Sequence, residues 1–152
     1  MSFDPRAKVK TLLGNVSVTN DAGGLAQLVV MYSGGWENLK QLFVEDSLDA
    51  ILTVDPATKV MAAPDRRIQD VPLRYNADVP VHVLAINTAI VTATTILEKI
   101  RVDIRDVIEA DPQKSEYTVF ISRVQSANRP RGGYDPLWQD DYVFYIRPVV
   151  GG

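Results

Sequence analysis

The stretch TAIVTATTILEKIRVDIRDVIEA, residues 88–110, decides the fold class that the sequence predicts. Its apolar residues recur at spacings of three and four, which places them on one face of an α-helix: Ala93, Leu97, Ile100, Ile104 and Val107. Asp111 precedes Pro112, and a residue before proline avoids the helical conformation, so the helix should end there. We therefore expect one long amphipathic helix that packs on a sheet.

Strand-like sequence flanks this helix on both sides. Residues 81–86 form a nearly continuous apolar run of strand length, which is typical of a strand covered on both faces, so we expect this strand to be central. Residues 117–125 and 142–149 are also predicted strands. A short helix is predicted near the start, capped by Asp4, with Pro5 in its first turn and Gly14 at its end.

Two hairpins are predicted before the central strand. Residues 16–19 and 25–32 surround a turn-forming run, and residues 49–54 and 59–63 surround Asp55-Pro56-Ala57-Thr58. Residues 36–43 are ambiguous, and residues 64–80 have the composition of a loop. The order of elements predicts a single α+β domain over residues 1–152, with a mainly antiparallel mixed sheet, the long helix packed on it and a short N-terminal helix.

Composition excludes several classes of protein. Of the 152 residues, 46% are hydrophobic and 23% are charged, which is ordinary for a folded domain. Sixteen basic against nineteen acidic residues give a net charge of −3, which argues against general nucleic-acid binding. The absence of cysteine excludes disulfides and thiolate sites. Neither a secretory signal nor a membrane-spanning stretch is visible, so we expect a cytoplasmic protein without a membrane partner.

Catalytic and metal-binding patterns are not found in the sequence. His82 is the single histidine and lies inside the strand of residues 81–86, so we interpret it as a partly exposed or hydrogen-bonded sheet residue. The acidic groups Glu45-Asp46-Asp49 and Asp140-Asp141 lack the spacing of a calcium loop, and the paired glycines do not form phosphate-binding motifs. The sequence therefore predicts a protein that is not an enzyme and holds neither a cofactor nor a metal.

The best functional indication is a predicted sixteen-residue connection, residues 126–141, between the last two strands. Hairpin loops are normally two to five residues long, and longer ones are often functional. Arginine mixed with aromatic residues is typical of protein interfaces, while nearby aspartates argue against a phosphate track, so we predict an interface, with a salt-bridged surface loop as the alternative. The candidate interface residues are Arg123, Arg129, Arg131, Tyr134, Trp138, Asp140, Asp141 and Arg147.

The order of these segments resembles the tail-terminator and tail-completion (neck) proteins of tailed viruses. The resemblance is carried by VPVHVLAI (79–86), ILEKIR (96–101) with Ile104-Arg105, the strand of residues 117–124, the long connection, YVFYIR (142–147) and the early helix, residues 4–13. It covers most of the chain in outline. Additional sequence at residues 36–48 and 64–78 departs from the family pattern and leaves the strand order open.

This resemblance implies a structural virion protein of the head-tail neck region. Such proteins form a ring, commonly a hexamer, that caps the tail tube and joins it to the head connector. The partners would be further copies of the chain, the tail tube protein and the connector or stopper protein, and the location would be the virion, or the host cytoplasm during assembly. Two alternatives remain: a small protein-binding adaptor domain, or an enzyme with a site near Arg123, Glu116 and Asp141.

Overall fold

A computed structural model of the chain describes residues 4–19, 24–32, 43, 48–60, 76–86, 93–112, 117–130 and 137–148. For residues 59, 60, 117, 122–130, 137 and 148 it describes the backbone only. Two helices and six strands have the following bounds: α1 Pro5–Leu13, β1 Leu28–Tyr32, β2 Ala50–Val54, β3 Thr58–Val60, β4 Asn76–Ile86, α3 Ala93–Glu109, β5 Tyr117–Pro130 and β6 Leu137–Pro148. The described part therefore has an α+β fold.

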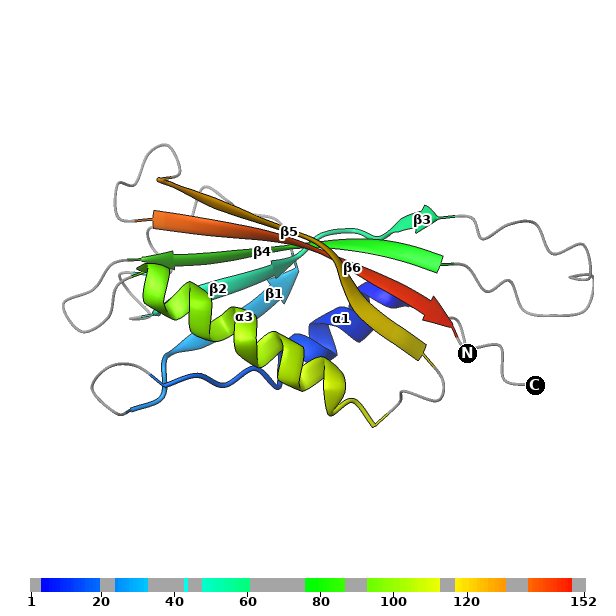
Figure 1. The fold of residues 1–152 in the computed structure, drawn as a ribbon, viewed down its shortest axis with the longest axis horizontal. Coiled ribbons are helices and arrows are strands. Elements are labelled where there is room, and N and C mark those ends of the chain that lie inside the picture. Colours follow the sequence, from blue (N-terminus) through cyan, green and yellow to red (C-terminus); the bar gives the residue numbers. More distant parts are fainter. Residues whose placement is uncertain are drawn as a thin grey trace, which may run out of the picture.

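One mixed sheet organises the molecule (Figure 1). Its strand order is β1-β2-β4-β6-β5, and β3 also pairs with β4. The pair β1 and β2 is parallel, and the other pairs are antiparallel. As predicted, the strand that contains residues 81–86 is central, although β4 begins at Asn76, inside the segment predicted to be a loop.

The predicted hairpin of residues 49–63 is wrong. β2 and β3 do not pair with each other but follow each other along the same edge of β4, with Val54 opposite Val81 and Thr58 opposite Asp78. Between them, the Asp55 amide donates to the Pro80 carbonyl at 2.9 Å. Asp55 and Pro56 therefore separate two strands that run in the same direction, and the chain does not reverse there. Pairing of both strands with β4 keeps this direction.

The predicted hairpin of residues 16–32 is reduced to one isolated bridge between Thr19 and Leu25. Residues 16–19 lie along α3: the Ser17 amide donates to Asp103 Oδ2 at 2.7 Å, and Lys99 Nζ donates to the Thr19 carbonyl at 2.9 Å. β1 pairs with β2 instead. The Ala26 amide still donates to the Val18 carbonyl at 2.9 Å, so a short part of the predicted pairing is present alongside the contacts with the helix.

β5 and β6 form a longer antiparallel pair than predicted. β5 extends to Pro130 and β6 begins at Leu137, so residues 126–130 and 137–141 are strand and the predicted sixteen-residue loop is wrong. The ladder has two irregularities, between Ile121 and Arg123 and between Ser126 and Pro130. Such bulges bend and twist a strand without ending it.

Helix α1 begins and ends where the sequence predicts. The Asp4 side chain accepts a hydrogen bond from the Ala7 amide at 3.1 Å, Pro5 occupies the first turn, and Gly14 is the C-terminal cap. An ion pair between Lys8 Nζ and Asp111 Oδ2, at 3.0 Å, ties the middle of α1 to the segment that directly follows α3. Both partners of this pair are largely buried.

Both helices lie on one face of the sheet (Figure 1). The inner face of α3 contributes Ala93, Ile96, Leu97, Ile100 and Ile104 to the main core, and Val107 packs against it while partly buried. A second, smaller core on the other side of the sheet contains Phe43, Ile51, Leu84 and Ile86. Neither described helix is long and apolar enough to cross a membrane.

Replacing Ile100, which is fully buried, should test the packing of α3. Ile100→Ala should lower the free energy of unfolding by about 2–5 kcal/mol, because it removes buried methyl groups and leaves a cavity. Val102, on the same helix, is 62% exposed, so Val102→Ala should change the free energy by less than about 0.5 kcal/mol. Urea denaturation measures both values, and equal effects of the two substitutions would contradict the packing described above.

Candidate functional site

The candidate site lies on the side of the sheet that faces away from α1 and α3. Because side chains alternate along a strand, Val79, Val81 and Val83 of β4 enter the main core, while Asp78, Pro80 and His82 lie on the opposite side. We call the β4-β6-β5 part of this side the open face. Its described side chains that are not buried are Asn76, Asp78, Pro80, His82, Thr118, Phe120, Gln139, Asp141, Val143, Tyr145 and Arg147.

A polar cluster around His82 occupies one part of the open face. His82 Nδ1 lies 2.6 Å from Asp141 Oδ1, and His82 Nε2 lies 2.9 Å from Asp55 Oδ2. Gln139 Nε2 donates to the same Asp141 oxygen at 2.6 Å. His82 and the two aspartates are 23 to 27% exposed, so they form a half-buried cluster. The prediction of a hydrogen-bonded, partly exposed histidine is confirmed.

Three parts of the sheet bring this cluster together. His82 of β4 is directly opposite Asp141 of β6, and Asp55 follows the last residue of β2. Gln139 precedes Asp141 by two residues and so shares its face. The side chains therefore link β2, β4 and β6 across the sheet, in addition to the backbone ladder.

The chemistry of the cluster suits a cross-strand link. An imidazole in its neutral form has one N–H and donates to one carboxylate, whereas the imidazolium form donates to both. Since each ring nitrogen already faces a carboxylate, neither is directed at a nucleophile, as general-base catalysis requires. The two carboxylates approach opposite sides of the ring and do not converge, and the described residues contain no group of three ligands suited to a metal ion.

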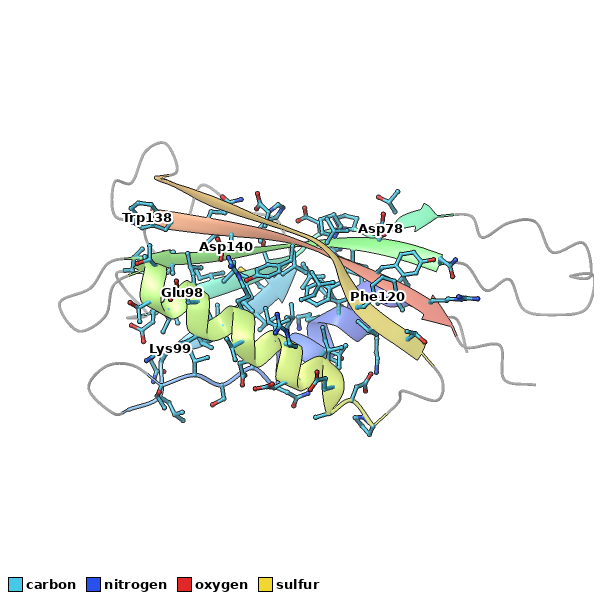
Figure 2. All side chains as sticks on the ribbon, in the orientation of Figure 1. Asp78, Glu98, Lys99, Phe120, Trp138 and Asp140 are labelled. Atoms are coloured by element: carbon cyan, nitrogen blue, oxygen red, sulfur yellow. The ribbon has the colours of Figure 1, made fainter. Side chains whose placement is uncertain are left out.

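An aromatic patch lies beside the polar cluster. The rings of Phe120 on β5 and Tyr145 on β6 are in tilted contact, with 4.8 Å between centroids, and Phe120 is 45% exposed. Pro80 lies opposite Val143, and Asp78 lies opposite Tyr145, in the adjacent rows of the sheet. We call Pro80, Phe120, Val143 and Tyr145 the aromatic patch. Figure 2 labels Phe120, which belongs to β5. It also labels Asp78, which lies on the side of the sheet away from the helices.

The four predicted interface residues whose side chains are described lie on two faces of the sheet, because β6 alternates between them. Asp140 is buried on the helix side, where Arg101 Nη2 of α3 donates to its Oδ2 at 3.1 Å (Figure 2). Trp138 packs against the main core on that side. Asp141 belongs to the polar cluster on the open face, and Arg147 is exposed near the end of β6.

The structure describes the remaining predicted residues only in part. Arg123 and Arg129 belong to β5, and their side chains are not described. Arg131 and Tyr134, and the alternative-site residue Glu116, lie outside the described residues. Sequence reasoning missed Asp55 and Phe120 as site residues. The alternation of residues 117–122 predicted which residues share a face of the strand with Phe120. The sequence did not predict the register of β5 against β6, which places Phe120 opposite Tyr145.

Comparisons with known proteins leave the family open. No family model matches the chain, and no curated protein sequence matches it. The function therefore has to be argued from the geometry of the open face.

Replacing the histidine should test the polar cluster. His82→Ala removes the ring that lies between two half-buried carboxylates and bonds to them, so the free energy of unfolding at neutral pH should fall by about 1–3 kcal/mol. Thr118→Ala, an exposed control on the same face, should change it by less than about 0.5 kcal/mol. A double-mutant cycle of His82→Ala with Asp55→Ala should give a coupling energy above about 0.5 kcal/mol. A coupling energy of zero would show that the pair does not interact.

The buried tyrosine beside Asp140 should make stability depend on alkaline pH. Burial raises the pKa of the Tyr142 phenol above its ordinary value of 10.0, and the charge of Asp140 also raises it, while Arg101 opposes the increase. The unfolded chain thus loses this proton at a lower pH than the folded chain. The stabilisation is fully present below about pH 10 and is lost as the pH rises through the folded-state value.

Tyr142→Phe should therefore make the decrease in unfolding free energy between about pH 9 and pH 11 shallower. Tyr32→Phe, on a half-exposed tyrosine, keeps Tyr142 and should retain the steeper decrease. Urea denaturation at several pH values measures both slopes. Identical slopes for Tyr142→Phe and the unmodified chain would rule out this contribution.

Proposed function

We propose that this chain is a structural assembly protein of the virion neck, which forms a ring that caps the tail tube and joins it to the head connector. The observation that carries the proposal is the aromatic patch: an exposed Phe120 ring in contact with Tyr145, on paired strands of a sheet whose other face is covered by helices. Exposed aromatic residues on a rigid support are typical anchors of protein interfaces.

The order of the elements supports the same proposal. The segments that carry the family resemblance are the early helix, the central strand, the long helix and the last strand pair, and they correspond to α1, β4, α3 and β5 with β6. Subunits of a closed ring need a contact surface that does not deform when neighbours bind. The polar cluster beside the patch links three parts of the sheet and supplies such support.

The proposal includes the partners and location that this role requires. Further copies of the chain would form the ring, and the tail tube protein and the connector or stopper protein would bind its two sides. The protein would act in the host cytoplasm during assembly and remain in the virion. An adaptor domain that binds one protein partner is a second candidate, because the same aromatic patch could serve it.

Mass in solution and electron microscopy test the proposal. The purified chain should sediment as a discrete multi-subunit species, commonly of six copies in the resembling family, and images should show rings or decoration of one tube end. Phe120→Ser should weaken self-association about tenfold or more, whereas Val102→Ser on the exposed side of α3 should not.

Two results would contradict the proposal in different ways. A chain that stays monomeric at all concentrations and ignores tail tubes and connectors would exclude the neck function. A one-to-one complex with a single protein partner, without rings, would favour the adaptor function instead.

A further inference from the structure

A closed ring requires two different surfaces on each subunit, because the contact is head-to-tail and not related by a twofold axis. The two surfaces must also lie on different sides of the subunit. Among the described residues, β1 pairs only with β2 and β5 pairs only with β6, so these strands form the two edges of the sheet. A side chain exposed at one edge can therefore meet a surface at the opposite edge of the next subunit.

The β1 edge carries a basic corner, which we define as Arg6, Lys10 and Tyr32. Tyr32, the last residue of β1, is 43% exposed. The Arg6 guanidinium lies 4.3 Å from the centre of its ring, and Lys10 Nζ lies 5.1 Å from it. Arg6 is held in place because its Nε and Nη2 both donate to the Val54 carbonyl, at 3.1 and 2.9 Å. This corner therefore presents an aromatic ring with two positive charges.

The aromatic patch lies on the open face, away from the helix side that carries the basic corner, with Phe120 on the edge strand β5. Carboxylates near β4, β6 and the end of β2 border it on the side away from the β5 edge. Asp78 lies opposite Tyr145 in the ladder, and Asp141 with Asp55 lies beyond Val143 in the polar cluster. Arg147, at the end of β6, is the basic residue described on this face, so its described charges are mainly acidic. The basic corner and the carboxylates that border the aromatic patch are thus opposite in charge, and both surfaces present aromatic rings.

We propose that the basic corner of one subunit docks on the aromatic patch of a second copy of the same chain, with Lys10 and Arg6 directed at Asp78. This inference rests on the proposed ring and names its contact. Tyrosine and arginine are enriched among the residues that dominate binding energy, and complementary charges fix the register of the two partners. The geometry gives each subunit one donor surface and one acceptor surface, which allows a ring to close.

Charge reversal tests the contact. Lys10→Glu and Asp78→Lys should each weaken self-association about tenfold or more, because each places like charges together. The double variant Lys10→Glu/Asp78→Lys restores opposite charges and should recover assembly. Arg105→Glu, exposed on α3 and outside both surfaces, is the control for the change in net charge and should assemble like the unmodified chain. Sedimentation velocity measures the association, and circular dichroism verifies that each variant folds.

Introduced cysteines provide a second test that does not depend on charge. The chain contains no cysteine, so thiols can be added beside the two surfaces without background reactivity and without removing their aromatic rings. Thr11→Cys lies next to Lys10 on α1, and Thr118→Cys lies two residues before Phe120 on the same face of β5. Under mild oxidation, a mixture of the two single variants should form cross-linked dimers, and the double variant should form a ladder of multimers. Each single variant alone should stay uncross-linked, because like edges do not meet in a head-to-tail contact.

The outcomes separate this inference from the proposed function. Rings that form equally well with every charge variant, or that give no cross-links between the two introduced cysteines, would overturn the contact and leave the ring standing. Cross-linking of a single variant with itself would show a twofold contact and also overturn it. A chain that is monomeric before any substitution would remove the proposed function, and this contact with it.

Discussion

The ladder between β4 and β6 holds the molecule together and sets its two faces. Residues 77–86 of β4 pair in register with residues 137–146 of β6, so one side of both strands enters the core and the other side forms the open face. A shift of this register by one residue would exchange the two sets of side chains. With β4 fixed, it would bring Asp141 of β6 into the apolar core and expose Phe144 and Tyr142. The ion pair between Arg101 and the buried Asp140 opposes such a shift, because Asp140 meets its partner on α3 only in this register.

Local signals predicted the parts of the fold that depend on neighbours in the chain. Asp4, Pro5 and Gly14 mark α1 because capping acts within one turn, and the apolar run of residues 81–86 marks the central strand. The turn chemistry at Asp55-Pro56 misled the prediction, since pairing of β2 and β3 with β4 overrides a local preference for reversal. Residues 126–130 and 137–141 are poor in strand-forming residues, yet each segment continues as strand against the other.

The site was less predictable than the fold, for a physical reason. Asp55, His82 and Asp141 are far apart in the sequence, and only the strand order and register bring them within hydrogen-bonding distance. The sequence identified arginines and aromatic residues near the last strands, but it did not show which side of β6 each one occupies. Because side chains alternate along β6, Asp140 lies on the helix side of the sheet and Asp141 lies on the open face.

The position of β6 also determines when the protein can fold during synthesis. β6 lies between β4 and β5 in the sheet, although it follows both in the chain. A ribosome that has completed β5 therefore holds a chain whose central strand still lacks one neighbour, with an exposed edge able to pair with other chains. Completion of the sheet requires the hairpin of β5 and β6 to form and then dock on β4 across a long sequence separation, which is a slow kind of step. The chain therefore completes its sheet, and closes the exposed edge of β4, only after its last described strand has been synthesised.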